Sequence, residues 1–440
     1  MRRAVGPDPV RLLDAAHPSF EDASMLGPQP RQRLYTSLSA YGKFAGDLVS
    51  GRVRQGASVA ELERRFANQV GAVHAVAAPL ARTALYFVLR ALIREGQAVV
   101  LSPYTISDVV NMVLCAGGRP VFADIEPDSC NISAAEVERL VEDNTGAVLV
   151  THFHGLASDI ERIRGFCQRR GVPLIEDCAQ ALGTKVAGRH VGTFGDAGIF
   201  SFGLFKCVTS FLGGMVVTDN AQLAEEVRRQ TADLAFERPG ALAGRAAHAA
   251  AIDLATSPPL FGALTFPMFR WARMHGHGSL ERQFAFDHNP AAKDHIPERY
   301  LHRMTPAQAR LVLRQLDTVD AHAAERIRKA EMYYEGLRTV PQVRLPPRRT
   351  DGSHTYQYYP IQIPDREAFV TYALSHGRDL AVSHHRNCAA MECFAPYGSD
   401  CPNAARSERE TVYLPTYPAY ADREVRSNIE LLHRFFGRQH

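Results

Sequence analysis

Short apolar runs alternate with amphipathic stretches over residues 58–219 of the chain. The runs are rich in Val, Ile and Ala, which is typical of buried strands, and the stretches between them carry the three-to-four-residue period of a helix. This alternation predicts an α/β fold, a mostly parallel sheet with helices on both faces. Strands are predicted at 74–79, 98–102, 120–125, 147–153, 172–177 and 215–219, and helices at 58–70, 83–93, 107–117 and 161–171.

Three helix starts carry the residue pattern of a capping box. In this pattern a hydroxyl group and a Glu or Gln three residues later satisfy the first free N–H groups of the helix. A proline follows the hydroxyl residue in the third of them, and proline is favoured in the first turn. The pairs are Ser58 with Glu61, Ser133 with Glu136, and Thr305 with Gln308.

Composition divides the chain into four parts. Residues 1–55 are rich in Pro, Gly and Arg and are predicted to form an N-terminal arm ahead of a large domain at 56–248. An apolar helical insertion is predicted at 249–299. Residues 300–440 contain a connecting helix, a second periodic helix and a strand-like run at 355–363, which together predict a smaller C-terminal α/β domain.

The insertion is most apolar at 249–283, where Phe, Leu and Met gather around the only tryptophan, Trp271. Its three prolines and its length exclude a helix that spans a membrane. One interpretation is a helical segment buried against the body of the protein or against a dimer partner. The other is an apolar lid or docking surface for a lipid-like or carrier-bound substrate.

Composition, charge and cysteine content limit the class of protein. The chain has 440 residues, of which 46% are hydrophobic and 22% charged, values typical of a soluble enzyme of about two domains. A net charge of +3 gives no argument for a nucleic-acid or anionic-membrane partner. The eight cysteines include no C-x-x-C pair, which disfavours a zinc site and a disulfide framework and predicts a reducing cytoplasm. Neither a secretory signal nor a transmembrane segment is predicted.

Asp177 and Lys206 are the leading candidates for chemistry. Asp177 ends the strand predicted at 172–177, at the carboxyl edge where α/β sheets bind ligands, and Lys206 lies in the segment 198–220 that leads into a later strand. A lysine amine forms a Schiff base with the aldehyde of pyridoxal phosphate. A carboxylate keeps the pyridine nitrogen protonated so that the ring withdraws electrons. The pair therefore predicts a pyridoxal phosphate enzyme.

The residues around this pair form a longer pattern. Residues 176–180 read E-D-C-A-Q, Ser201 stands five positions before the lysine, and a double glycine follows at 213–214. This pattern resembles the DegT/DnrJ/EryC1/StrS aminotransferase family, and the resemblance extends more weakly over 55–225 and 300–435. It implies a fold-type I pyridoxal phosphate transferase, with a mostly parallel seven-stranded sheet and a smaller C-terminal domain, that works as a homodimer.

The resemblance also implies roles for four residues. Asp177 would pair with the pyridine nitrogen, Gln180 would lie near the ring hydroxyl, and Ser201 would bind the phosphate. Lys206 would carry the Schiff base and then act as the general base that shuttles a proton. No metal site is predicted.

The chain departs from the family pattern at the phosphate site. The usual Gly-Thr or Gly-Ser segment is replaced by Ala81-Arg82, ahead of Thr83. We expect Arg82 or Thr83, together with the free N–H groups of the following helix, to hold the phosphate. The alternative is that Arg82 is a surface residue and Thr83 an ordinary residue of a helix start.

Two further positions depart from the pattern. The aromatic residue that stacks on the cofactor corresponds to Ile106, so Tyr104 is the candidate stacking residue, with a core tyrosine as the alternative. The asparagine that reaches across the dimer to the partner's phosphate corresponds to Leu301, with His302 or Arg303 as candidate substitutes.

Three histidines are candidate residues of the substrate pocket. His152 and His154 lie at the strand end before Asp177 and match an x-H-x-x-G pattern of the family, whereas structural histidines with satisfied hydrogen bonds are the alternative. His385 belongs to a basic segment of the C-terminal region that is a candidate to meet a substrate carboxylate, with a solvated loop as the alternative. The segment also contains Arg378, His384 and Arg386.

These observations predict a pyridoxal-phosphate-dependent aminotransferase. The resemblance implies L-glutamate as the amino donor and a keto or aldehyde acceptor, either a nucleotide-linked keto-sugar or a non-sugar biosynthetic intermediate. A dehydratase or lyase is one alternative, although dehydratases that resemble this family replace the lysine with histidine. A non-catalytic scaffold is the other, and the retention of Asp177, Gln180, Ser201 and Lys206 opposes it.

Overall fold

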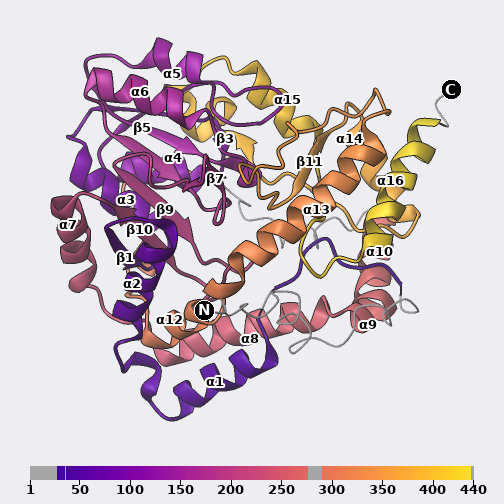
Figure 1. Cartoon of the computed structure of the whole chain (residues 1–440), viewed down its shortest axis with the longest axis horizontal. Coiled ribbons are helices and arrows are strands. Elements are labelled where there is room, and N and C mark those ends of the chain that lie inside the picture. Colours follow the sequence, from indigo (N-terminus) through magenta and orange to yellow (C-terminus); the bar gives the residue numbers. More distant parts are fainter. Residues whose placement is uncertain (1–26, 35, 276–289, 438–440) are drawn as a thin grey trace, which may run out of the picture.

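A seven-stranded sheet forms the centre of the computed structural model, which describes residues 27–34, 36–275 and 290–437 (Figure 1). The strand order is β1-β10-β9-β6-β5-β2-β4, and β4, β2, β5, β6 and β9 run parallel. Strand β10 is antiparallel to both of its neighbours. The predicted mostly parallel sheet is therefore confirmed. Its strands are β1 His74–Ala78, β2 Ala98–Leu101, β4 Arg119–Phe122, β5 Thr145–Thr151, β6 Leu174–Asp177, β9 Ala197–Ser201 and β10 Gly214–Thr218.

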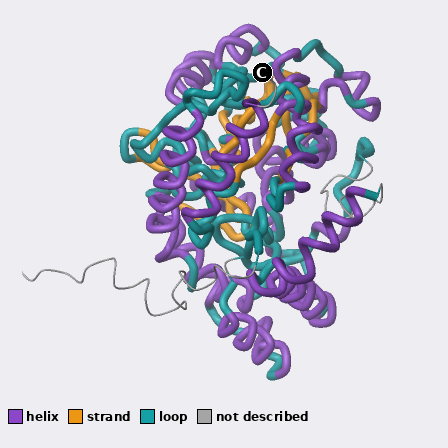
Figure 2. Tube along the Cα trace, turned by 90° about the vertical axis from the view of Figure 1, so that its right-hand side faces the viewer, coloured by secondary structure: helices purple, strands orange, loops and turns teal. Residues whose placement is uncertain are grey.

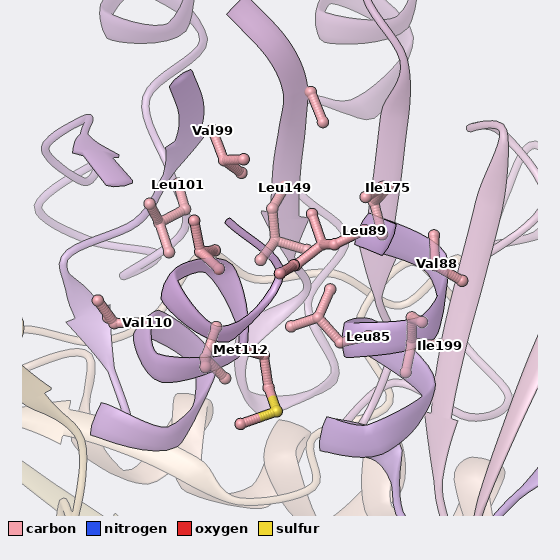
Figure 3. Packing of buried hydrophobic residues seen from close by; sticks show 14 of the residues in the cluster. Leu85, Val88, Leu89, Val99, Leu101, Val110, Met112, Leu149, Ile175 and Ile199 are labelled. Carbon is pink, nitrogen blue, oxygen red and sulfur yellow. The ribbon is translucent and has the colours of Figure 1, made fainter. Parts of the chain in front are cut away.

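Helices cover both faces of this sheet, because alternate residues of its strands point to opposite sides. Leu149 packs with α3, α4 and α7 in one apolar cluster, whereas its neighbour Val148 packs with α5 and α6 in another. Figure 3 shows the first cluster, with Leu85 and Leu89 of α3 facing the sheet, and Figure 2 shows helices around the strands. The helices are α2 Ser58–Val70, α3 Ala81–Leu92, α4 Ser107–Cys115, α5 Ala134–Leu140, α6 Ile160–Arg170, α7 Ala221–Ala232 and α12 Pro306–Leu313.

A second, smaller unit follows the long helix α13. Its antiparallel sheet has the order β11-β14-β12 and shares one apolar core with helices α13, α14 and α16. This confirms the predicted smaller C-terminal α/β domain. The short strand β13 pairs with β3, which follows a strand of the large sheet, and this pairing links the two units. The elements of this region are α13 Val319–Leu337, β11 Tyr359–Gln362, α14 Arg366–Ser375, β12 Ala381–Val382, β13 Arg386–Asn387, α15 Pro402–Glu410, β14 Thr411–Leu414 and α16 Asp422–Gly437, and the short strands outside it are β3 Tyr104–Thr105, β7 Lys185–Val186 and β8 Arg189–His190.

Outside these two units the structure is helical at residues 38–49 and over most of 239–274, whereas residues 27–34 and 290–297 contain no helix. Helix α1 (Leu38–Val49) packs on α8 and α12 through an apolar cluster that includes Phe44 and Leu242. The apolar insertion continues α8 (Pro239–Ala255), and its residues 276–283 lie outside the described part of the chain. Among the described residues no helix is long and apolar enough to cross a membrane. The remaining helical elements are α9 Pro258–Leu260, the π-helical turn Phe261–Thr265 and α10 Phe266–Met274.

One of the three predicted capping boxes forms. The Thr305 hydroxyl accepts from the backbone N–H of Gln308, and the Gln308 side chain accepts from the backbone N–H of Thr305, as predicted. At Ser58 the predicted helix start is right and the capping box is wrong, because the N-cap residue is Ala57 and the Ser58 hydroxyl instead accepts from Arg310 at 3.2 Å. At Ser133 the helix start is right and the side-chain cap is wrong, because the hydroxyl makes no capping bond.

Candidate active site

The two leading candidates lie at the carboxyl edge of the large sheet. Asp177 is the last residue of β6, and Ser201 is the last residue of the neighbouring parallel strand β9. Lys206 lies in the loop between β9 and β10, in a turn that its backbone N–H closes by donating to Gly203 O at 3.2 Å. The strand order thus brings an acid, a hydroxyl and an amine to one edge, where α/β sheets bind ligands.

These three side chains line one cavity of about 200 Å³. The starts of α3 and α4 form a second wall, which includes Arg82 and Ile106. Two residues of the C-terminal region, Tyr358 and His384, complete the cavity. No residue of 249–275 lines it.

The start of α3 presents free backbone N–H groups to this cavity. Its first residues, Leu80 and Ala81, line the wall, and no side chain caps the helix. Gly214 lets the helix start approach the sheet, because a Cβ there would lie 2.6 Å from the backbone nitrogen of Ala81. Uncapped N–H groups and the helix dipole favour an anion. This end of the cavity is therefore suited to a phosphate.

Arg82 is held at the same end by an acidic partner. Its guanidinium forms an ion pair with Asp108 and approaches the hydroxyl of Tyr300 at 3.1 Å. Burial alone would raise the pKa of Asp108, but the Arg82 charge and a bond from Lys293 hold that pKa below its ordinary value. The cluster therefore keeps one arginine charge beside the phosphate end of the cavity.

Burial shifts the pKa of both leading candidates. It lowers the pKa of the Lys206 amine, and the charge of Asp177 opposes that shift. It raises the pKa of Asp177, whereas the N–H of Ala179, which donates to Oδ1 at 2.9 Å, and the charge of Lys206 oppose the rise. A buried amine with a lowered pKa is more often unprotonated, and therefore a better nucleophile and base.

Gln180 and His385 belong to a buried network behind the cavity wall. The Gln180 Oε1 accepts from the backbone N–H of His154 at 2.9 Å, so its Nε2 is the group that donates to His385 Nε2 at 3.0 Å. His385 therefore carries its proton on Nδ1, which lies 3.0 Å from the hydroxyl of Tyr413. Tyr104 joins through its hydroxyl, 2.6 Å from the Ser383 hydroxyl, and is buried.

The imidazole of His154 lies buried in the same region. Neither of its ring nitrogens has a hydrogen-bond partner among the described residues, and the ring lies edge-on to that of Tyr413, with centroids 5.1 Å apart. Burial and the nearby His384 lower the pKa of His154 to about 3. His154 also has a left-handed backbone, with φ of 59°. The structure thus places a neutral histidine behind the wall.

His152 pairs with a buried glutamate that the sequence reasoning did not single out. Its Nδ1 accepts from Ser158 N–H at 3.1 Å, so its proton lies on Nε2 and is donated to Glu176 Oε2 at 3.0 Å. Glu176 also accepts from the N–H groups of Gly192 and Gly195, at 2.8 and 2.7 Å. Full burial of a charged residue type inside a predicted apolar strand was the signal for this role. Cys178 lies close to this pair, whose donors and acceptors already satisfy one another.

The other predicted positions lie at varied distances from the cavity wall. Thr83 is buried and donates to the carbonyl of Tyr300 at 3.0 Å. Leu301 packs against the main apolar cluster, whereas His302 and Arg303 line a small basic hollow next to Leu80. Two arginines of the C-terminal segment pair with acids elsewhere, Arg378 with Glu424 and Arg386 with Glu408.

Replacing Glu176 with Gln should destabilise the fold by about 2–3 kcal/mol. The amide of Gln would place an NH₂ group where Glu176 now has an acceptor oxygen. That NH₂ group would face N–H donors, so buried groups would be left without a hydrogen-bond partner. Urea unfolding followed by circular dichroism measures the loss. Glu136→Gln is the matched control, because Glu136 makes a surface ion pair with Arg139, and such pairs contribute little to stability. Equal stability of the two variants would contradict the role given to Glu176.

Replacing His154 with Asn should reduce the loss of stability in acid. The unfolded chain binds a proton at this histidine below about pH 6.5, whereas the folded chain does so only near pH 3. The stability it contributes is therefore present above pH 6.5 and falls by about 1.4 kcal/mol per pH unit on the way to pH 3. Asn tolerates the left-handed backbone and does not titrate.

Unfolding free energies over that pH range test this expectation. The variant should show a shallower slope than the parent protein. His248→Asn, at an exposed position of α8, is the control and should keep the parent slope. A slope that is the same in all three proteins would contradict the prediction.

Comparison with known proteins shows the family of this chain. The sequence model of the DegT/DnrJ/EryC1/StrS aminotransferase family matches residues 42–433. The spore coat polysaccharide biosynthesis protein SpsC of Bacillus subtilis is 30% identical over 394 residues, which cover 87% of this chain and 90% of that protein. The GDP-perosamine synthase of Vibrio cholerae is 36% identical over 206 residues, 46% of this chain and 54% of that one.

The fold agrees as well. The crystal structure of the sugar aminotransferase CalS13 from Micromonospora echinospora superimposes with a TM-score of 0.72 at 22% identity, covering 92% of this chain and 99% of that one. The chain therefore belongs to the DegT/DnrJ/EryC1/StrS aminotransferase family and is a pyridoxal-phosphate-dependent aminotransferase.

Proposed function

We propose that this aminotransferase moves the amino group of L-glutamate to the keto group of a nucleotide-linked sugar. The observation that carries the proposal is the meeting of Lys206, Asp177 and Ser201 in one cavity, next to the uncapped start of α3. These groups are a nucleophilic amine, an acid, a hydroxyl and an anion site. The amine matches the aldehyde of the cofactor, the acid matches its ring nitrogen, and the hydroxyl and the anion site together match its phosphate.

The residues that hold the cofactor follow from this donor set. We propose that Asp177 meets the ring nitrogen, that Ser201 and the N–H groups of α3 meet the phosphate, and that Arg82 adds a charge there. Bound in this way, pyridoxal phosphate supplies an aldehyde for covalent attachment and a ring that withdraws electrons. The wall at Ile106 is apolar, and it offers the ring an aliphatic contact, with Tyr104 lying behind it.

Lys206 provides the acid–base chemistry in this proposal. Burial favours its unprotonated amine, so Nζ could accept the proton from Cα of the amino donor and deliver it to the former aldehyde carbon of the cofactor, and it would move a proton the opposite way in the second half-reaction. A cation that faces Asp177 would favour its charged form and oppose the burial that raises its pKa. The Ala179 N–H on Oδ1 fixes the direction in which the carboxylate points.

The acceptor is proposed from the relatives and tested against a non-sugar alternative. The printed names of the relatives refer to polysaccharide biosynthesis and to a GDP-linked sugar, which supports a nucleotide-linked keto-sugar. A non-sugar keto intermediate would use the same half-reaction with the amino donor, so only an acceptor assay separates the two.

We further propose a homodimer. The basic hollow formed by His302 and Arg303 next to Leu80 supports it, because a partner that approaches there would meet the phosphate end of the cavity. Light scattering should give twice the chain mass of 48.6 kDa. A single-chain mass at assay concentrations would contradict the dimer.

Replacing Lys206 with Ala should abolish both the cofactor's protein-dependent visible absorption band and the half-reaction with L-glutamate. Absorption spectra of the protein with pyridoxal phosphate, before and after glutamate, measure both. Lys185→Ala is the matched control, because Lys185 makes a surface ion pair with Asp320 and should keep the band. The parent band should shift with glutamate, and a nucleotide-linked keto-sugar should restore it.

Each alternative gives a different spectrum. A band that is unaffected by L-glutamate would point to another amino donor, or to a dehydratase or lyase. A protein that binds no cofactor would support a scaffold without catalysis. Restoration of the band by a non-sugar keto compound, and not by any keto-sugar nucleotide, would overturn the proposed acceptor.

A further inference from the structure

The exposed apolar side chains of this protein gather on one short arm. Among the described residues, five of the eight large hydrophobic side chains with high exposure lie between 254 and 274. Figure 1 shows α8 along the lower edge of the molecule, with α9 and α10 at its right-hand end. Scattered apolar residues are normal on a protein surface, but a concentrated patch marks an interaction site.

Four of these side chains form a stripe on the π turn and α10. They recur three or four residues apart, the spacing that places residues on one face of a helix. Each is 55–58% exposed. The opposite face is anchored, because Phe261 and Phe266 pack with Leu374 of α14 in a separate apolar cluster. The stripe consists of Leu264, Met268, Trp271 and Met274.

The arm is therefore held by the protein while it presents apolar residues outward. A second link is the ion pair of Arg273 with Glu367 of α14 at 3.0 Å. The side chain of Trp271 stacks on His275, with ring centroids 5.0 Å apart, and remains 57% exposed. A tryptophan with one wet and one apolar side is typical of the water–lipid interface.

The arm itself carries charges of one sign, and one of them, that of Arg273, is paired with Glu367 of α14. From residue 254 to residue 275 the chain contains Arg270 and Arg273 and no aspartate or glutamate. A second copy of this surface would bring the same basic residues face to face, because a twofold contact pairs a patch with itself. An anionic surface matches the charge and the apolar stripe together.

We propose that the α9–α10 arm docks on an anionic lipid bilayer, with the stripe of Leu264, Met268, Trp271 and Met274 lying in the interface. The arm lies parallel to the membrane plane, which requires no spanning helix. Arg270 meets lipid phosphate, while the stripe enters the boundary of the acyl region. The cavity that holds Lys206 has no residue of this arm in its wall, so catalysis and docking use separate surfaces.

The single tryptophan makes this proposal directly measurable. Trp271 is the only tryptophan of the chain, so its fluorescence reports the arm alone. The full chain loaded with pyridoxal phosphate is mixed with vesicles of phosphatidylcholine and phosphatidylglycerol in equal amounts, or of phosphatidylcholine alone. We expect the emission to shift to the blue only with the mixed vesicles, the protein to float with them, and high salt to weaken the binding.

Two double substitutions distinguish vesicle binding through the stripe from nonspecific hydrophobic binding. Leu264→Ser with Met268→Ser should weaken vesicle binding at least roughly tenfold, because two apolar side chains no longer leave water. Leu38→Ser with Val49→Ser is the matched control on α1, where the side chains are 88% and 91% exposed, and it should bind as the parent does. Retention of the cofactor's absorption band shows that each variant is folded.

Three results would overturn the proposal. Emission that never responds to mixed vesicles excludes a lipid partner. Emission that is already blue in the protein alone means that another segment of the chain covers the stripe. A blue shift that follows protein concentration without vesicles, together with a mass that rises and that Leu264→Ser lowers, means that a second copy is the occupant.

Discussion

A single buried carboxyl group fixes the strand end on which the active site depends. Glu176 has no exposed surface, and its two oxygens accept from His152 and from the backbone N–H groups of Gly192 and Gly195. These bonds hold three segments together: the end of β5, the loop that leads into β9, and the end of β6. The next residue is Asp177, so the position of the acid in the cavity is set by the hydrogen bonds of its neighbour.

Charge is balanced within the cavity in two pairs. Asp177 and Lys206 influence each other's pKa in opposite directions to burial, and Arg82 and Asp108 form an ion pair at the phosphate end. Arg82 also lowers the pKa of Lys206, although burial has the larger effect. An arginine in place of a small residue therefore does two things in this chain. It brings a positive charge to the start of α3, beside the cavity, and it favours the unprotonated form of the lysine.

Three of the histidines, His152, His154 and His385, lie outside the cavity lining. His385 and Gln180 form one directional chain of hydrogen bonds, in which the backbone N–H of His154 sets the orientation of the amide and thereby the tautomer of His385. His384, in contrast, reaches the cavity wall. The C-terminal domain thus contributes to the site both a lining residue and the support behind it.

The sequence by itself determined six of the seven strands of the large sheet, the position of Asp177 at a strand end and the nearby Ser201 and Lys206, but not β9. These features depend on short-range periodicity and on motifs within about thirty residues, which local patterns carry. It failed at Ser58 and Ser133 because a hydroxyl at a helix start has other partners, such as Arg310. Only the tertiary structure decided which residues meet. Gln180 and His385 are 205 positions apart, and Arg82 and Tyr300 are 218 apart. Such contacts arise from the packing of two domains, which no local pattern encodes.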